Sequence, residues 1–186
     1  MTTEMILRPA QRARGGMTFW PLVMHDGDDV RLMLGPLGTY PAVIPFEPSV
    51  FGGNGGEPRK SIRFSIQDQE ILNNLKDLED KAKALLDGTQ ERYTWNTAIT
   101  EATELYPATI KAKLWVTGER AVTVRDQRGV AIAMPKQPWP RPRANAVLEA
   151  RGIYRLANGN AGLIIQTTAL QLSDGVRPDV ADPFET

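Results

Sequence analysis

Apolar runs occupy residues 17–24 and 30–34, whereas hydrophobic and polar positions alternate over residues 61–66 and in the segments that follow residue 106, with glycine-containing turns between them. Such alternation is typical of strands that bury one face. The predicted strands span residues 17–24, 30–34, 40–46, 61–66, 109–117, 121–126, 130–134, 146–156 and 162–172. The last two are joined through Asn158-Gly159, which favours a type I′ hairpin because both central positions of that turn need positive φ.

One segment has helical rather than strand periodicity. Its apolar residues recur at spacings of three and four, at Ile71, Leu75, Leu78, Ala82 and Leu85. Ser65 and Asp68 resemble a capping box before the segment, and Gly88 follows it. Residues 93–105 show a weaker helical pattern. We therefore expect a helical insertion over residues 67–105.

The length and the turn pattern together predict one small β-barrel with an inserted α-helix. A chain of 186 residues is long enough for a single well-buried core. We expect residues 1–173 to form this one domain, with residues 1–16 as an N-terminal arm that pairs at a sheet edge. Residues 174–186 are acidic and contain proline, so we expect a disordered tail.

Charge is unevenly distributed along a chain whose formal net charge is zero. Residues 111–155 carry ten basic and three acidic side chains, a net of +7. Residues 67–104 carry nine acidic and four basic side chains, and residues 174–186 carry four and one, so their net charges are −5 and −3. The basic block is suited to contact with a phosphate backbone.

Composition excludes several classes of site. The absence of cysteine excludes disulfides and thiolate metal sites, and the single histidine, His25, excludes any two-histidine mechanism. The glycine-rich segment 52–56 lacks the Gly-Lys-Ser/Thr of a phosphate-binding loop. No apolar run approaches the roughly 18 residues of a membrane-spanning helix. We expect no catalysis, no cofactor, no metal site and no membrane contact.

The strand predicted over residues 109–117 has the most informative pattern. Alternation divides it into an apolar face of Ile110, Ala112, Leu114 and Val116 and a polar face of Lys111, Lys113 and Trp115. A base needs a flat partner on which to stack, and its phosphate needs a nearby cation, so the polar face suits single-stranded nucleic acid. Arg125 points outward from the next predicted strand in the same way. The alternative is an ordinary solvated face with one exposed tryptophan.

A proline-rich loop over residues 134–143 forms a second candidate contact. It carries Lys136, Trp139, Arg141 and Arg143. Prolines keep such a loop extended at low entropic cost, and loops of small barrels can clamp an oligonucleotide. The alternatives are a plain surface connection and a polyproline ligand for another domain.

The acidic tail is a candidate partner-binding segment. It includes Asp179, Asp182 and Phe184. The phenylalanine could enter a pocket of a partner protein while the carboxylates meet a basic rim. The alternative is a solubilising tail in which Phe184 has no partner.

The run from Leu105 to Leu114 and the hairpin from Arg151 to Ile165 resemble replicative single-stranded DNA-binding proteins of tailed phages and large DNA viruses. The tail is similar to the acidic, phenylalanine-bearing C-terminus of that class, although two residues follow Phe184. The resemblance implies an oligonucleotide-binding (OB) barrel with an inserted helix that binds single-stranded DNA without sequence preference. It also implies a role in phage replication or recombination and a location in the host cytoplasm.

The resemblance further implies replication proteins as partners of the tail, and it leaves a homo-oligomer open. Two other functions remain compatible with the residues. One is a phage structural or assembly protein whose basic block is incidental, and the other is an RNA-binding barrel.

Overall fold

A computed structural model describes residues 4–34, 42–45, 49–50, 59–134 and 143–173. These residues form thirteen strands, one α-helix and a short 3₁₀ turn, η1, at Arg14–Gly16. The N-terminal strands are β1 (Met5–Leu7), β2 (Gln11–Arg12), β3 (Thr18–Met24), β4 (Val30–Leu34), β5 (Ala42–Val43), β6 (Ser49–Val50) and β7 (Arg59–Ile66). The helix α1 (Gln69–Asp87) precedes β8 (Thr94–Trp95), β9 (Ile99–Thr100), β10 (Ala108–Trp115), β11 (Thr123–Arg125), β12 (Arg143–Arg155) and β13 (Asn160–Leu172).

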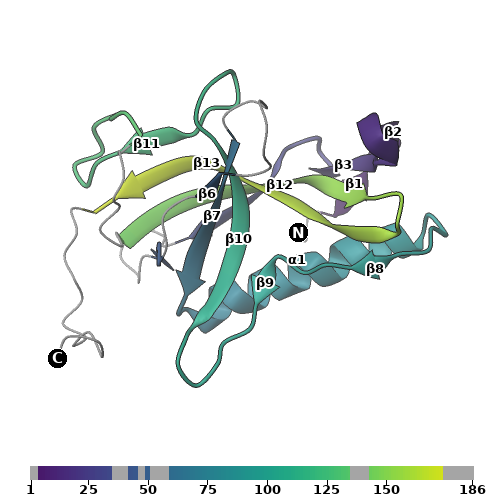
Figure 1. Cartoon of the computed structure of the whole chain (residues 1–186), viewed down its shortest axis with the longest axis horizontal. Helices are drawn as coiled ribbons and strands as arrows, with labels where there is room; N and C mark the ends of the chain where they lie inside the picture. Colours follow the sequence, from purple (N-terminus) through teal and green to yellow (C-terminus); the bar gives the residue numbers. More distant parts are fainter. Residues whose placement is uncertain (1–3, 35–41, 46–48, 51–58, 135–142, 174–186) are drawn as a thin grey trace.

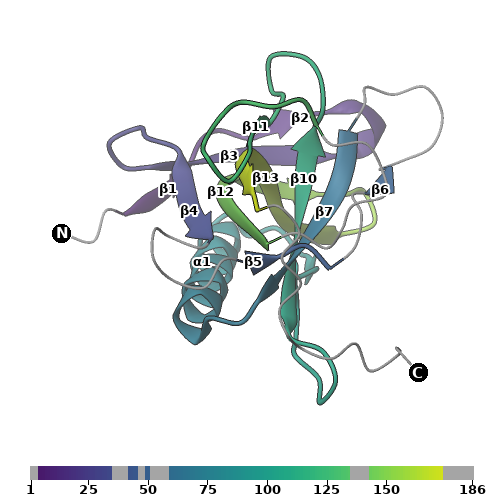
Figure 2. The same cartoon turned by 90° about the vertical axis from the view of Figure 1, so that its left-hand side faces the viewer.

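Five strands close into a ring. The order β12–β5–β7–β10–β13 returns to β12 because β12 and β13 also pair with each other. Every pairing in this ring is antiparallel except that of β10 with β13 (Figures 1 and 2). The chain is therefore a mainly β, OB-like barrel with a helix inserted between β7 and β10, as the alternating pattern and the resemblance predict.

The remaining strands extend the two longest members of the ring. β12 and β13 have thirteen residues each. β3 and β4 add to the free edge of β12, and β1 and β2 pair with β3, so the N-terminal segment lies at the edge of the sheet. β6 pairs with β7, β9 with β10, and β8 and β11 with β13 (Figure 1).

Two bulges keep the long hairpin aligned with the core. In β12 the buried apolar residues are Ala144, Ala146, Leu148 and Ala150, and the next one is Ile153. The residues that face the core therefore change from even to odd positions after Ala150. The register with β13 shifts at the same place, between Ala150 and Gly152. A Cβ atom at Gly152 would collide with the backbone of Trp20 and the ring of Phe19, so this close approach to β3 requires glycine.

The β12–β13 turn differs from the predicted type I′. Only Gly159 has positive φ, at 90°. The Gly159 N–H donates to the Leu156 carbonyl at 2.9 Å, and the Leu156 N–H donates to the Asn160 carbonyl at 2.8 Å. This is a three-residue loop in which a type I turn is followed by a glycine bulge. The turns at Gly27 and Gly129 have the equivalent pair of hydrogen bonds, and their glycines also have positive φ, at 93° and 80°.

The helix begins after Asp68 and ends at Asp87. The Asp68 side chain accepts from the backbone N–H groups of Glu70 and Ile71, and Gly88 is the C-cap. Ser65 takes no part in the cap because it lies within β7 and pairs with Thr109. α1 lies below the β12–β13 hairpin in Figure 1, and its buried apolar residues join the barrel core; they are Leu72, Leu75, Leu78, Ala82 and Leu86.

The helix predicted over residues 93–105 is wrong. This segment forms β8 and β9 instead. The carboxylate of Glu79, only 6% exposed, accepts from the Thr97 hydroxyl at 2.5 Å and from the Ala98 N–H at 2.8 Å. These bonds hold the segment against α1 in an extended form, so tertiary contacts override a weak helical pattern.

The strand predicted over residues 130–134 is also wrong. Only Ala131 forms a bridge, with Arg125, and Val130 and Ile132 are 57% and 40% exposed. Of the strand predicted over residues 40–46, Ala42–Val43 is observed as β5, and residues 40, 41 and 46 lie outside the described part of the chain.

We expect Thr167→Val to stabilise the fold. Thr167 is 0% exposed and pairs with Leu114, and its hydroxyl has no hydrogen-bond partner among the described residues. An unsatisfied buried hydroxyl costs about 1–3 kcal/mol, so removing it at constant shape should raise the free energy of unfolding by about 1 kcal/mol. Urea melts measure this change. Thr168→Val is the matched control, because the Thr168 hydroxyl donates to the Val147 carbonyl at 3.3 Å. A loss of stability in Thr167→Val would show that the Thr167 hydroxyl does have a hydrogen-bond partner.

Candidate nucleic-acid interface

The outer face of β7 and β10 gathers basic side chains from both strands. Residues opposite each other in an antiparallel pair point to the same side of the sheet. The outward pairs are Trp115 with Arg59, Lys113 with Ser61, Lys111 with Arg63, and Thr109 with Ser65. Four of these eight positions are basic, one is an indole and none is acidic.

The predicted sorting of β10 into two faces is confirmed. Burial alternates along the strand, with Ala108, Ile110, Ala112 and Leu114 buried toward the core. Lys111 is exposed, while Lys113 and Trp115 are half-buried on the outer side. Val116 lies just beyond the end of the strand and is half-buried.

Arg59 and Trp115 form a cation–π pair. The guanidinium carbon of Arg59 lies 5.6 Å from the centroid of the Trp115 ring. This contact fixes the indole at the end of β10 and places a positive charge against its ring. Sequence reasoning missed Arg59, because only the register between β7 and β10 brings it to Trp115.

Arg63 is held at the other end of the face. Its guanidinium donates to the hydroxyl groups of Thr100 and Thr109, at 3.1 and 3.5 Å. Residues 61–66 alternate in sequence, which puts Arg63 on the polar side of its strand, whereas the proximity of Lys111 follows only from the register.

Lys113 lies in the middle of this cationic face. Burial lowers the pKa of its ammonium group below the usual value, and the positive charges of Arg59 and Lys111 lower it further. All three causes act against the protonated form. A bound anion would act in the opposite direction, so this position is electrostatically suited to a phosphate.

A loop borders the face on the side of β13. β10 and β11 pair in parallel with successive parts of the same edge of β13, and residues 116–122 form an excursion between them. The Val122 N–H donates to the Trp115 carbonyl at 2.9 Å and closes the base of this loop. Gln166 is opposite Lys113 in β13, and its side-chain amide donates to the Arg120 carbonyl at 3.2 Å. The loop therefore covers the outer face next to Lys113.

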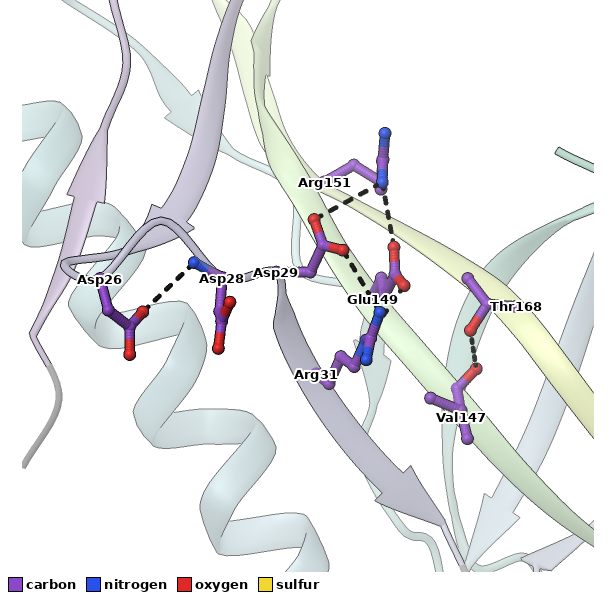
Figure 3. A network of polar contacts seen from close by, with 8 residues as sticks. All are labelled: Asp26, Asp28, Asp29, Arg31, Val147, Glu149, Arg151 and Thr168. Carbon is purple, nitrogen blue, oxygen red and sulfur yellow. Dashed lines mark hydrogen bonds and ion pairs between the residues drawn. The ribbon is translucent and has the colours of Figure 1, made fainter. Parts of the chain in front are cut away.

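Beyond Gln166 the same outer face is balanced in charge. Glu149 pairs with Gln166 and is 6% exposed. Its two oxygens accept from Arg31 at 3.3 Å and from Arg151 at 3.0 Å (Figure 3). Asp29 also lies 3.4 Å from Arg31 and 3.9 Å from Arg151, so two carboxylates neutralise two guanidinium groups.

Of the two predicted arginines that remain among the described residues, Arg125 lies apart from the face on β7 and β10, whereas Arg143 lies near its Ser65 end. Arg125 pairs with Gln171, five residues along β13 from Gln166, or about 16 Å at ~3.3 Å per residue. Its guanidinium donates to the Gly129 carbonyl at 2.8 Å. Arg143 begins β12, is half-buried and pairs with Val43, which in turn pairs with Ser65 of the face. The structure thus brings Lys111, Lys113 and Trp115 together, leaves Arg125 apart from them, and places Arg143 two strands from the Ser65 end of the face.

The other predicted contacts lie outside the described residues. They are Lys136, Trp139 and Arg141 of the proline-rich loop and Asp179, Asp182 and Phe184 of the tail. Within the described part of the chain, no group of three His, Asp or Glu side chains could hold a metal ion. No helix there has the length and apolar character required to cross a bilayer.

No protein-family model matches the chain, and no curated protein matches it in sequence. In structure it is similar to the C-terminally truncated single-stranded DNA-binding protein of bacteriophage Enc34, with a TM-score of 0.56 and 13% identity over 92% of this chain and 97% of that one. It is also similar to gp2.5, a single-stranded DNA-binding protein encoded by bacteriophage T7, with a TM-score of 0.53 and 11% identity over 78% of this chain and 87% of that one. At these identities the likeness concerns the fold: the chain has the fold of phage single-stranded DNA-binding proteins, in agreement with the resemblance seen in its sequence.

Proposed function

We propose that this protein binds single-stranded DNA without sequence preference through the outer face of β7 and β10. In this proposal the protein catalyses no reaction and serves phage DNA replication or recombination. The observation that carries the proposal is the register of these two strands. It places Arg59, Arg63, Lys111 and Lys113 on the same face as Trp115, and the eight outward positions of this face include no carboxylate. The structural likeness to two phage proteins that bind single-stranded DNA supports it.

In this proposal Trp115 stacks on a base and the surrounding cations neutralise phosphates. The Arg59 guanidinium holds the indole in place, so little side-chain entropy is lost when a base stacks on it. Every base has a π face, so stacking is tolerant of sequence. Phosphate contacts release counterions and supply an affinity that depends on salt.

Binding to several nucleic acids tests the function directly. We expect oligo-dT to bind far more tightly than duplex DNA, because stacking requires unpaired bases. Each phosphate contact to a single strand contributes about 0.7 to the salt slope, so four cations predict a slope of log affinity on log salt near −3. Titration by fluorescence anisotropy at several salt concentrations measures both. Equal affinity for duplex DNA, or an affinity independent of salt, would contradict the proposal, and tighter binding of oligo-rU would favour an RNA-binding protein.

Substitutions at two neighbouring residues of β10 should have opposite effects. Trp115→Ala should cost about 1–3 kcal/mol of oligo-dT affinity, the usual value of one stacked base, with little loss of stability. Leu114→Ala is the matched control: Leu114 is 0% exposed, so its truncation should cost about 2–5 kcal/mol of stability and leave the folded protein able to bind. Thermal melts and titrations separate the two. A Trp115→Ala protein with full affinity and a lowered Tm would show that the indole acts only in packing.

Affinity for oligo-dT should also decrease at alkaline pH. The lowered pKa of Lys113 means that its ammonium loses a proton before an ordinary lysine, which titrates at about 10.4. The charged form binds phosphate, so affinity is complete below this lowered pKa and falls as the pH rises through it. Lys113→Arg is the control, because a guanidinium keeps its charge over the whole range. The same pH profile in both proteins would show that Lys113 does not contact the phosphate.

A further inference from the structure

The loop over residues 116–122 has a fixed shape. Its base is closed by the bond between Val122 and Trp115, and the Ala121 N–H donates to the Gly118 carbonyl at 3.0 Å. Gly118 has a φ of 88°, a backbone conformation that residues other than glycine rarely adopt. The loop is therefore a defined turn that starts directly after Trp115.

Gln166 attaches this turn to the sheet. Its side chain is buried, at 6% exposed for the residue, and its amide donates to the Arg120 carbonyl at 3.2 Å. Gln166 also pairs with Lys113 on the neighbouring strand, and neighbouring strands lie about 4.8 Å apart. The backbone of Arg120 is thus held next to Lys113 at the border of the cationic face.

The charges on the two sides of this turn differ. On the side of β7 and β10 lie the four cations of the face. On the side of β12 lies Glu149, whose carboxylate already engages Arg31 and Arg151 (Figure 3). Arg120 itself is exposed, and among the described residues its guanidinium makes no ion pair. Arg120, whose backbone is held beside Lys113, would therefore add a further cation at this border of the face.

From this geometry we infer that the 116–122 loop is a wall of the single-strand site, that Arg120 is a further phosphate-binding residue, and that Gln166 is the positioning residue that holds it there. This inference rests on the proposed function. It also assigns a path to the single strand, which follows β7 and β10 on one side of the wall and does not cross the wall onto β12.

A double-mutant cycle tests the inference. Arg120→Ala should lower oligo-dT affinity several-fold and reduce the salt slope by about 0.7, the contribution of one phosphate contact. Gln166→Met keeps the side-chain length but removes the amide donor, so it should lower affinity in the same direction. In the Arg120→Ala background Gln166→Met should have little further effect, because coupled residues are not additive. Arg14→Ala, which removes an exposed arginine of η1, is the matched control and should leave affinity unchanged.

Lys111→Ala separates failure of this inference from failure of the proposed function. If Lys111→Ala and Trp115→Ala lower affinity but Arg120→Ala leaves affinity and salt slope unchanged, the wall is wrong and the function stands. If none of the three changes affinity, the function is wrong as well. Additive effects of Arg120→Ala and Gln166→Met would show that Gln166 does not position Arg120. If Gln166→Met does not fold, Gly118→Ala distorts the same turn without a clash, because no atom lies within 4 Å of the added Cβ.

Discussion

The pairing of β12 with β13 is the constraint on which the other parts of the structure depend. Each strand uses one edge for the other, and the remaining edges hold six of the other eleven strands: β3, β4 and β5 on β12, and β8, β10 and β11 on β13. Two bulges in this long hairpin change which residues point inward, so that apolar side chains face the core along its whole length. At one of these bulges Gly152 makes room for β3. The same pairing fixes Gln166 and Glu149 side by side, so it also determines where the cationic part of the outer face ends.

Within this frame, the candidate site follows from the position of β10 between β7 and β13. The inward residues Ile110 and Leu114 fill the core, and the outward residues Lys111 and Lys113 must then lie together beside Arg59 and Arg63. Burial lowers the pKa of the Lys113 ammonium group, and the positive charges of Arg59 and Lys111 lower it further. A polyanion bound along the face would act in the opposite direction. The same residues that complete the barrel therefore bring the charges together that we propose bind DNA.

The sequence predicts what depends on local pattern and misses what depends on distant partners. Alternation predicts β7 and β10, an apolar run after a turn predicts β4, and apolar spacing predicts α1, because these signals are contained within each segment. Residues 93–105 were misassigned because their extended form depends on Glu79, which lies in another element. Likewise, Lys111, Lys113 and Trp115 could be assigned to one face from β10 alone, whereas Arg59, Arg63 and Arg120 join the site only through strand register and a side-chain contact from β13.

Photocrosslinking tests most directly whether the outer face of β7 and β10 is the surface that contacts a single strand. Oligo-dT carrying a photoreactive iodouracil would be irradiated with the full-length protein, and the modified peptides would be identified by mass spectrometry. The account predicts that the main adduct is on Trp115, with any weaker ones on the outward residues of β7 and β10 or on the 116–122 loop. Adducts confined to the Arg31, Glu149 and Arg151 side of the sheet, or to the N-terminal strands, would contradict it.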